Sequence, residues 1–237
     1  PPDLPPIPYW SSPLWAFTAW GGQMTTSDFG EAFVFDGKRR EEYLFGIGLS
    51  KKIYQNGPFA LELEGDLFRH HAKEQEGGPS QSVPFALTPA QSFYEGIAAI
   101  SARVWIRPWL NIALLEGVSY TTSISEFERT NRNKQSQFLN YLGVEIESAV
   151  SERFSLVGRV HHRSGAFGTF NGVRGGSNAY LLGFRYRWGM QNLKGKVDQR
   201  NSFNECSQKE NLTKPILRNL DDGLEVISLR KLNIFSN

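Results

Sequence analysis

Apolar and polar side chains alternate with a period of two along most of the chain. In residues 58–69, for example, Leu61 and Leu63 have one parity, whereas Glu62 and Glu64 have the other. Because successive side chains of a β-strand point to opposite faces, this pattern predicts strands with one apolar and one polar face. Eight such strands are expected, at residues 14–22, 43–54, 58–69, 93–107, 110–122, 138–149, 153–163 and 177–188.

The connections between these segments alternate between long polar loops and tight turns. The long loops cover residues 25–42, 71–92, 123–137 and 165–176, and the tight turns lie at residues 55–57, at Pro108 and at residues 150–152. Outer-membrane barrels have short periplasmic turns and longer extracellular loops, whereas a soluble sandwich has no reason to sort its loops this way. The sequence therefore predicts an all-β fold, an eight-stranded antiparallel up-and-down transmembrane β-barrel whose odd-numbered strands run outward. A short run at residues 31–36 is expected to extend the first hairpin.

The polar parity of the strands carries charges of both signs. A small barrel is just wide enough inside for side chains to fill it, so these residues are expected to point inward and to pair, leaving no pore. The expected interior residues are Glu62, Glu64, Asp66, Arg103, Glu145, Glu147, Arg159, Arg185 and Arg187. Glu116 departs from the pattern because it shares the parity of Ile112 and Leu114, and a bulge or a rim position would explain it.

Composition favours sheet over helix. The chain is 40% hydrophobic, with 23 Gly and 17 Phe, and no segment approaches the roughly 18 to 20 consecutive apolar residues of a membrane helix. A mean hydropathy of -0.39 does not count against a membrane barrel, whose strands are half polar. Aromatic residues near strand ends suit a girdle at the membrane interface, although 13% aromatics could also fill a soluble core. The expected girdle residues are Trp15, Trp20, Trp105, Trp109, Tyr120 and Trp188.

Two segments flank the patterned residues 14–188. Residues 1–6 lack the basic and apolar regions of a signal peptide, so we expect that an export signal has been removed and that residues 1–13 form an N-terminal periplasmic segment. Residues 189–237 are expected to be a polar C-terminal tail, which holds the one cysteine, Cys206. A net charge of +2, with both signs spread along the chain, gives no argument for a nucleic-acid partner.

The seventh strand ends with an imidazole and a hydroxyl that stand two residues apart. By parity His162 and Ser164 continue the lipid-facing row, while His161 and Arg163 point toward the lumen. Polar groups on the lipid-facing surface cost free energy unless they lie near the interface, and a strand that runs outward ends there. The pair is therefore expected beside the outer leaflet.

Residues two apart on a strand share a face, so the imidazole and the hydroxyl are candidates for serine-histidine catalysis. A serine hydroxyl becomes a nucleophile when an imidazole takes its proton, and the imidazole acts best when a third group fixes its tautomer. Asn178, on the eighth strand, is the nearest side chain able to hold His162, and the backbone N–H groups of Gly165 and Ala166 are candidates for an oxyanion hole. The alternative is that the histidines and Arg163 are rim residues that bind loops, phosphate or sugar groups.

A metal site is not expected. His70 and His71 are neighbours at the outward end of the third strand, but neighbours on a strand face opposite sides, and the chain has no cluster of cysteines. We expect both histidines to belong to a solvated rim.

The stretch VHHRSGAFGTFNGVRGGSNAYLLGFRYRW resembles the lipid A 3-O-deacylase (PagL) family and related acyloxyacyl-hydrolase-like outer-membrane proteins. Members of the family have eight strands and a His-x-Ser pair at the outer end of the seventh strand, on the lipid-facing surface. The resemblance spans residues 14–188, and its specific part lies in the last two strands. It implies that His162 is the general base and Ser164 the nucleophile.

Two positions depart from the family's pattern. The family has an Asn after the serine, where this chain has Gly165, and a Glu about a dozen residues beyond the serine, which falls at Gly176. Asn178 would then replace the Glu, since an amide can also orient a histidine, although it stabilises imidazolium less than a carboxylate does.

The resemblance implies an esterase in the outer membrane of a Gram-negative-type bacterium, which removes an ester-linked acyl chain from lipid A or lipopolysaccharide. Such a reaction needs no metal or organic cofactor. Arg163 and Arg174, near the rim, are candidates to bind anionic head groups. The other hypothesis is a non-catalytic barrel, either structural or surface-binding. A monomer and a homodimer both remain open.

Overall fold

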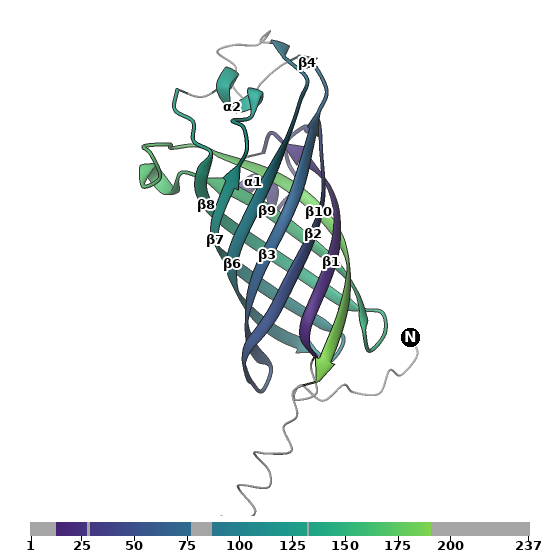
Figure 1. The fold of residues 1–237 in the computed structure, drawn as a ribbon. Coiled ribbons are helices and arrows are strands. Elements are labelled where there is room, and N and C mark those ends of the chain that lie inside the picture. The colour runs from purple at the N-terminus through teal and green to yellow at the C-terminus, as the bar shows by residue number, and fades with distance from the viewer. Residues whose placement is uncertain (1–12, 28, 77–86, 132, 191–237) are drawn as a thin grey trace, which may run out of the picture. The chain divides into compact units, whose positions relative to one another are not determined.

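The alternating segments form the strands of a closed barrel (Figure 1). The computed structural model describes residues 13–27, 29–76, 87–131 and 133–190, and within them eight strands pair antiparallel in the order β1-β10-β9-β8-β7-β6-β3-β2. Their bounds are β1 Pro13–Thr25, β2 Arg39–Asn56, β3 Phe59–Ala72, β6 Gln91–Arg107, β7 Leu110–Thr121, β8 Phe138–Ala149, β9 Phe154–Ser164 and β10 Gly176–Met190. The predicted fold class is confirmed. The calls for residues 1–12 and 191–237 lie outside the described residues.

The connections alternate in length as the sequence predicts. Tight turns join β2 to β3, β6 to β7 and β8 to β9. The long loops carry small elements of their own: α1 (Phe29–Ala32), the hairpin of β4 (Gln75–Glu76) and β5 (Leu87–Thr88), α2 (Glu126–Asn131) and the 3-10 turn η2 (Ala166–Gly168). Figure 1 shows all of these loops at one end of the barrel. This is the asymmetry of an outer-membrane barrel.

The expectation that residues 31–36 extend the first hairpin is wrong. These residues form the end of α1 and a turn, in which Phe33 N–H donates to Gly30 O (3.3 Å) and Val34 N–H donates to Glu31 O (3.1 Å). A strand here would need a partner for each N–H group, and local hydrogen bonds satisfy them instead.

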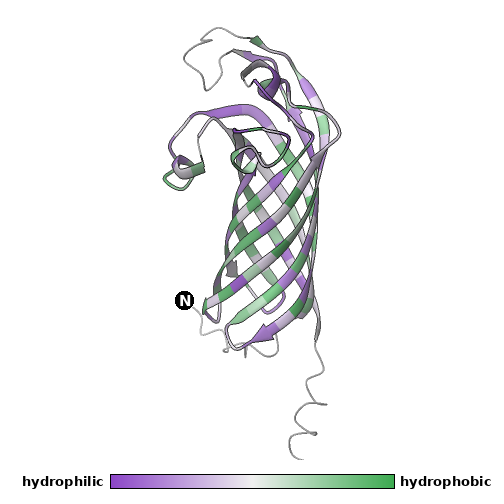
Figure 2. Cartoon of the chain, turned by 90° about the vertical axis from the view of Figure 1, so that its left-hand side faces the viewer, coloured by the Kyte–Doolittle hydropathy of each residue, from purple (hydrophilic) through white to green (hydrophobic). Residues whose placement is uncertain are grey.

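Side chains sort by parity into an apolar outer wall and a charged lumen. Large apolar residues are exposed on the outer parity of the strands, whereas nearly every other residue between them is buried. Figure 2 shows hydrophobic and hydrophilic positions alternating along the strands. We use the term outer wall for this outward-facing surface. An apolar outside with a polar inside is the arrangement of a membrane-spanning β-barrel. In the part of the chain that the structure describes, no helix is long and apolar enough to cross a membrane.

The lumen is filled by the ion-pair network that the sequence predicts. Arg103 donates to Glu62 (3.0 Å), Glu145 (2.9 Å) and Glu147 (2.8 Å), and all of these groups are buried. Each arginine has several donors in a planar fork, so one guanidinium can bind two or three carboxylates from different strands. The network ties together strands that are not neighbours in the barrel.

Arg159 is a second arginine of this network, which also includes Arg185 and Arg187. Arg159 donates to Asp66 (2.6 Å), to Glu145 (2.8 Å) and to Glu64, and its guanidinium lies 4.3 Å from the ring of Trp20. Buried charges are tolerated only when they are paired in this way. The predicted charged interior is therefore confirmed.

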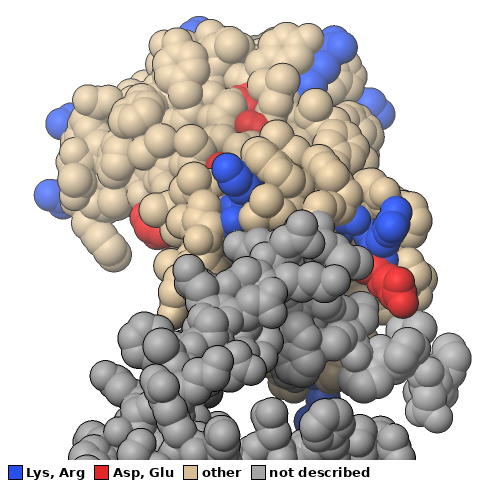
Figure 3. Space-filling view, turned by 60° about the horizontal axis from the view of Figure 1, so that its bottom comes forward, with Lys and Arg blue, Asp and Glu red and all other residues tan. Residues whose placement is uncertain are grey.

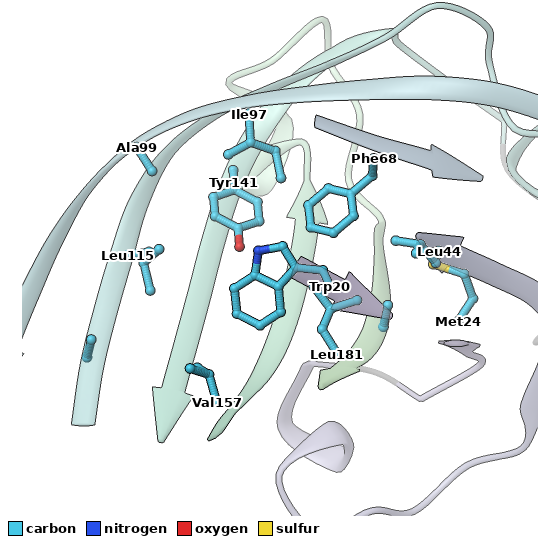
Figure 4. Close-up of a cluster of buried hydrophobic side chains, with 12 residues drawn as sticks. Trp20, Met24, Leu44, Phe68, Ile97, Ala99, Leu115, Tyr141, Val157 and Leu181 are labelled. Carbon is cyan, nitrogen blue, oxygen red and sulfur yellow. The ribbon is translucent and has the colours of Figure 1, made fainter. Parts of the chain in front are cut away.

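Apolar side chains fill another part of the lumen (Figure 4). Trp20 lies in this cluster with Phe68 and Tyr141, and its indole N–H donates to Asp66 (3.2 Å). The expectation that Trp20 belongs to an interface girdle is therefore wrong. Its parity places it inside, where the indole has a hydrogen-bond acceptor that lipid would not supply.

Two further expectations are wrong: the bulge at Glu116 and the solvation of His70. Glu116 faces outward and is exposed, but β7 pairs regularly with both neighbours around it, so neither strand has a bulge there. His70 is buried rather than solvated, because it lies between Glu42 (Nδ1 to Oε1, 3.0 Å) and Glu95 (Nε2 to Oε2, 2.8 Å). Of these two neighbouring histidines, His71 is the exposed one.

The turn end of the barrel faces the viewer in Figure 3. Basic and acidic side chains are both distributed along the visible edge of this end. Its visible part therefore has no large patch of a single charge.

Candidate active site

The His162–Ser164 pair lies at the loop end of β9, on the outer wall. Burial alternates along β9, and both residues have the outward parity and are half-buried. Register places Asn178 of β10 opposite His162, and Gly176 opposite Ser164. The predicted histidine, serine and asparagine thus lie on one small patch of two paired strands.

Asn178 holds one nitrogen of His162. Asn178 Oδ1 lies 2.6 Å from His162 Nδ1, and Asn178 Nδ2 donates to the backbone oxygen of Ser27 (2.6 Å). A carbonyl oxygen can only accept, so it fixes the amide with its nitrogen toward Ser27 and its oxygen toward the imidazole. Nδ1 then carries the hydrogen, and the basic lone pair lies on Nε2.

The β1–β2 loop covers this pair from outside. Asn178 is only 1% exposed although its parity is outward, and the ring of Phe29 lies 4.3 Å from the ring of His162. The cover comes from α1, which begins at Phe29. A hydrogen bond shielded from water is stronger and better oriented than an exposed one.

Gly176 leaves the space that the imidazole occupies. A Cβ on Gly176 would stand 2.5 Å from His162 Cε1 and 3.1 Å from Ser164 Cβ. The Cε1 edge of the ring therefore lies over Gly176, the residue of β10 that is paired with Ser164. The glutamate that the family resemblance places at this position would not fit beside His162 in this arrangement.

Of the two backbone N–H groups predicted to form an oxyanion hole, that of Gly165 already donates a hydrogen bond within the protein. Gly165 N–H donates to Gly175 O (3.2 Å), so the expectation for Gly165 is wrong. A Cβ on Gly165 would stand 1.9 Å from Val173 O, so a close approach of the loop explains this glycine. Ala166 N–H points at Ser164 Oγ over 3.5 Å and remains a candidate.

Sequence reasoning missed Asn140. It has the outward parity of β8 and is paired directly with Ser164, which puts the Cβ atoms of the two residues about 5 Å apart. No hydrogen bond of its side-chain amide occurs among the described residues, so its N–H groups are available to a ligand. The signal was present in the sequence, but it needed the register between β8 and β9.

The two arginines predicted to bind head groups lie in different environments. Arg163 is buried in the lumen, where it donates to Ser119 (3.0 Å), Thr121 (3.1 Å) and Gln137 O (2.8 Å). The expectation that it binds a head group is wrong, because its odd parity turns it away from the membrane. Arg174 is exposed on the β9–β10 loop.

An apolar groove of about 800 Å³ runs along the outer wall below the site. Gly21 and Gly158, which have no side chains, leave room for the groove. Its apolar lining includes Phe45, Val160 and Leu182. Tyr180 lines the groove as well. Val160 and Tyr180 are paired with each other, and each lies two residues from His162 or Asn178 on the same face of its strand. The groove therefore begins beside the candidate site, and its size and lining suit an extended apolar chain.

A second histidine-serine contact lies on another part of the outer wall. His71 Nδ1 is 3.0 Å from Ser92 Oγ, both residues are exposed, and they are paired across β3 and β6. No described hydrogen bond holds the other ring nitrogen of His71. This pair has the hydroxyl and the base without the orienting group, and it provides a control for the site at Ser164.

Within the described ranges, no group of three or more His, Cys, Asp or Glu side chains is placed to hold a metal ion.

No protein-family model and no curated protein matches the chain. Among solved structures it is similar to Ail, the attachment invasion locus protein of Yersinia pestis, in complex with the heparin analogue sucrose octasulfate. The TM-score is 0.45 with 10% sequence identity, over 75% of this chain and 99% of that chain. A second structure of Ail gives a TM-score of 0.44 at the same identity. The outer membrane channel DcaP of Acinetobacter baumannii gives a TM-score of 0.27 with 14% identity, over 65% of this chain and 42% of that chain.

Proposed function

We propose that the protein is an outer-membrane esterase that removes an ester-linked acyl chain from lipid A or a related glycolipid. The observation that carries this proposal is the chain of contacts from Ser27 through Asn178 to His162, which orients the imidazole on the strand face that also carries Ser164. In serine-histidine hydrolases the third group has this role, because it fixes the tautomer and orientation of the imidazole.

In the proposed reaction, Ser164 Oγ attacks the ester carbonyl carbon and its proton passes to His162 Nε2. The tetrahedral intermediate collapses, the bond between the acyl carbon and the sugar oxygen breaks, and Nε2 returns the proton to that oxygen. Water then attacks the acyl-serine in the same way and releases the fatty acid. Asn178 keeps the imidazole in the required tautomer throughout.

The oxyanion of the intermediate needs donors on the far side of the carbonyl. The Asn140 amide and the Ala166 N–H lie on two sides of Ser164 and are the candidates for this role. Such donors act most strongly on a surface from which water is excluded, as it is at the edge of a lipid layer.

The substrate class follows from the surroundings of the site and from the family resemblance. The groove beside His162 is apolar and lies on a wall that faces lipid, so an acyl chain could enter it without leaving the membrane. Arg39 lines the mouth of the groove and Arg174 is exposed on the neighbouring loop, and both cations suit a phosphorylated head group. Lipid A offers ester-linked chains and phosphates in the outer leaflet of a Gram-negative-type bacterium.

The test uses purified barrel refolded with lipopolysaccharide, followed by mass spectrometry of the lipid A. The wild-type protein is expected to remove the mass of one acyl chain, Ser164→Ala is expected to lose this activity, and Ser92→Ala, in the exposed second pair, is expected to keep it. Correct folding of each variant is checked by its heat-dependent gel mobility.

Three results would contradict the proposal. Lipid A that keeps its mass favours the non-catalytic barrel. Activity that survives Ser164→Ala excludes this serine as the nucleophile, and activity that is lost only in Ser92→Ala moves the site to the second pair.

A further inference from the structure

Two loops that flank the candidate site present exposed apolar tips. In the β1–β2 loop, Val34 and Phe35 are 72% and 71% exposed, and in the β9–β10 loop the side chain of Phe167 is 101% exposed. A phenylalanine side chain that is exposed to this extent is less stable in water than in an apolar environment. Exposed apolar side chains grouped in this way are typical of a surface that contacts a membrane, a protein or a ligand.

The β1–β2 loop lies against the outer wall rather than above it. Phe35 stacks on Tyr180 at 5.2 Å between ring centroids, and the Arg39 guanidinium lies 5.3 Å from the centroid of the same ring. Phe33 and Phe35 also line the groove on the wall. The apolar surface of this loop is thus continuous with the lipid-facing surface of the strands.

The β9–β10 loop also contacts the outer wall through an aromatic side chain. Phe170 contacts Phe138, an exposed residue of the outer wall, with ring centroids 5.7 Å apart. Phe167 projects from this loop with a φ of 57°, and Ala166 before it has a φ of 45°. Two consecutive non-glycine residues in the left-handed region are uncommon, and this backbone turns the phenylalanine outward.

Each apolar tip has an arginine beside it. Arg39 lies over Tyr180 next to Phe35, and the Arg174 side chain passes within 3.9 Å of the point where a Cβ on Gly168 would stand, next to Phe167. Neither arginine forms an ion pair within the described residues. An aromatic tip with a cation at its base is the side-chain pattern of segments that enter an anionic lipid surface.

The other long loops differ from these two. The β3–β6 loop with β4, and the β7–β8 loop with α2, rise farther from the strands than α1 and the β9–β10 loop do (Figure 1). The base of the β3–β6 loop is polar, with Lys73 and Glu41 in a solvent-exposed ion pair (3.7 Å). The rim of the barrel is therefore uneven, with its apolar side next to His162.

We infer that the tips of the β1–β2 and β9–β10 loops insert into the acyl region of the outer leaflet, while Arg39 and Arg174 bind the phosphate groups of anionic lipids. The occupant of this surface is the lipid layer itself. The inference requires a membrane-spanning barrel and does not depend on the esterase activity.

Environment-sensitive fluorophores attached to single cysteines test the insertion. In a Cys206→Ser background, the label is placed by Val34→Cys, by Phe167→Cys and, as the control on the taller loop, by Glu74→Cys, which is exposed. The labelled barrels are reconstituted in vesicles of phosphatidylcholine with 25% phosphatidylglycerol by lipid, after their folding has been checked by gel mobility. Quenching by doxyl-labelled lipid reports contact with acyl chains, and quenching by acrylamide reports contact with water.

We expect labels at positions 34 and 167 to be quenched several-fold more by doxyl lipid, and several-fold less by acrylamide, than the label at position 74. Equal acrylamide quenching at all three positions would overturn the insertion. The role of the arginines is tested with vesicles of phosphatidylcholine alone and with Arg39→Gln/Arg174→Gln. Protection at positions 34 and 167 should be greater in the anionic vesicles, and the double variant should abolish that difference. Protection that is independent of lipid charge would overturn the phosphate contacts.

Discussion

Gly176 and His162 fit together because the glycine has no side chain: a Cβ on Gly176 would stand 2.5 Å from His162 Cε1. Gly176→Ala is therefore expected to displace the imidazole by about 1 Å and to reduce kcat by about 10²-fold, without loss of the barrel. Steady-state deacylation kinetics check this. Gly65→Ala is the matched control on the outer parity of β3, away from the groove, where the added Cβ meets the backbone oxygen of Ile97 at an ordinary 3.8 Å. Equal activity of both variants would show that the imidazole position is not critical.

Asn178→Ala removes the acceptor that keeps the hydrogen on His162 Nδ1. We expect kcat to fall by about 10²- to 10⁴-fold, because the imidazole loses its tautomer and its orientation. The control is Asn171→Ala, which removes an amide of the β9–β10 loop that donates to Ser136 Oγ (2.7 Å). This variant should keep activity within a few-fold of wild type. If Asn178→Ala were as active as Asn171→Ala, the amide would have only a structural role.

Asn140 is expected to stabilise the transition state rather than to bind the substrate. Asn140→Ala and Asn140→Asp both lack the donating amide, so each should lower kcat by about 10²- to 10³-fold with little change in KM. Rapid-mixing measurements of acyl-enzyme formation separate this effect from product release. A change in KM alone would place Asn140 in substrate binding and leave the oxyanion without a side-chain donor.

Arg159 is expected to be essential for the stability of the barrel. Arg159→Met removes the arginine that pairs with Glu64 and Asp66, whereas Glu145 keeps its ion pairs with Arg103 and Arg185. The variant should lower the free energy of unfolding by about 3–5 kcal/mol. Urea unfolding in lipid vesicles, followed by tryptophan fluorescence, measures this. Arg153→Met, at an exposed arginine in the β8–β9 turn, should change stability by less than about 0.5 kcal/mol. A small effect at Arg159 would mean that the acids are not charged in the folded barrel.

Glu116 is a carboxylate on an otherwise apolar wall, so Glu116→Leu is expected to stabilise the barrel in vesicles by about 1 kcal/mol. Glu152→Leu, in the exposed β8–β9 turn, serves as the control and should have no such effect. The same unfolding experiment reports both. Destabilisation by Glu116→Leu would show that this carboxylate lies outside the acyl region of the membrane.

The sequence predicts the strands and their facing well, because one rule, the alternation of side chains, decides both. The same parity places His162 and Ser164 outside and Arg159 inside before any coordinates are known. It also contains the information that Trp20 points inward, but the tendency of tryptophan to lie at membrane interfaces outweighed the parity.

What parity cannot supply is the register between strands and the path of the loops. Asn140 becomes a candidate only when β8 is aligned with β9, and His70 is seen to be paired only when β3 is placed between β2 and β6. The backbone oxygen of Ser27, which orients Asn178, arrives from a loop more than a hundred residues away in sequence. Its approach depends on loop contacts that no local pattern records.

The lumen filled by Arg103, Arg159 and their carboxylates leaves the outer wall as the face that this protein offers to other membrane molecules. A lipid substrate would therefore reach Ser164 sideways, by diffusion within the leaflet. The encounter is a search in two dimensions, and its frequency follows the number of lipid molecules per unit area of membrane rather than any concentration in the surrounding water.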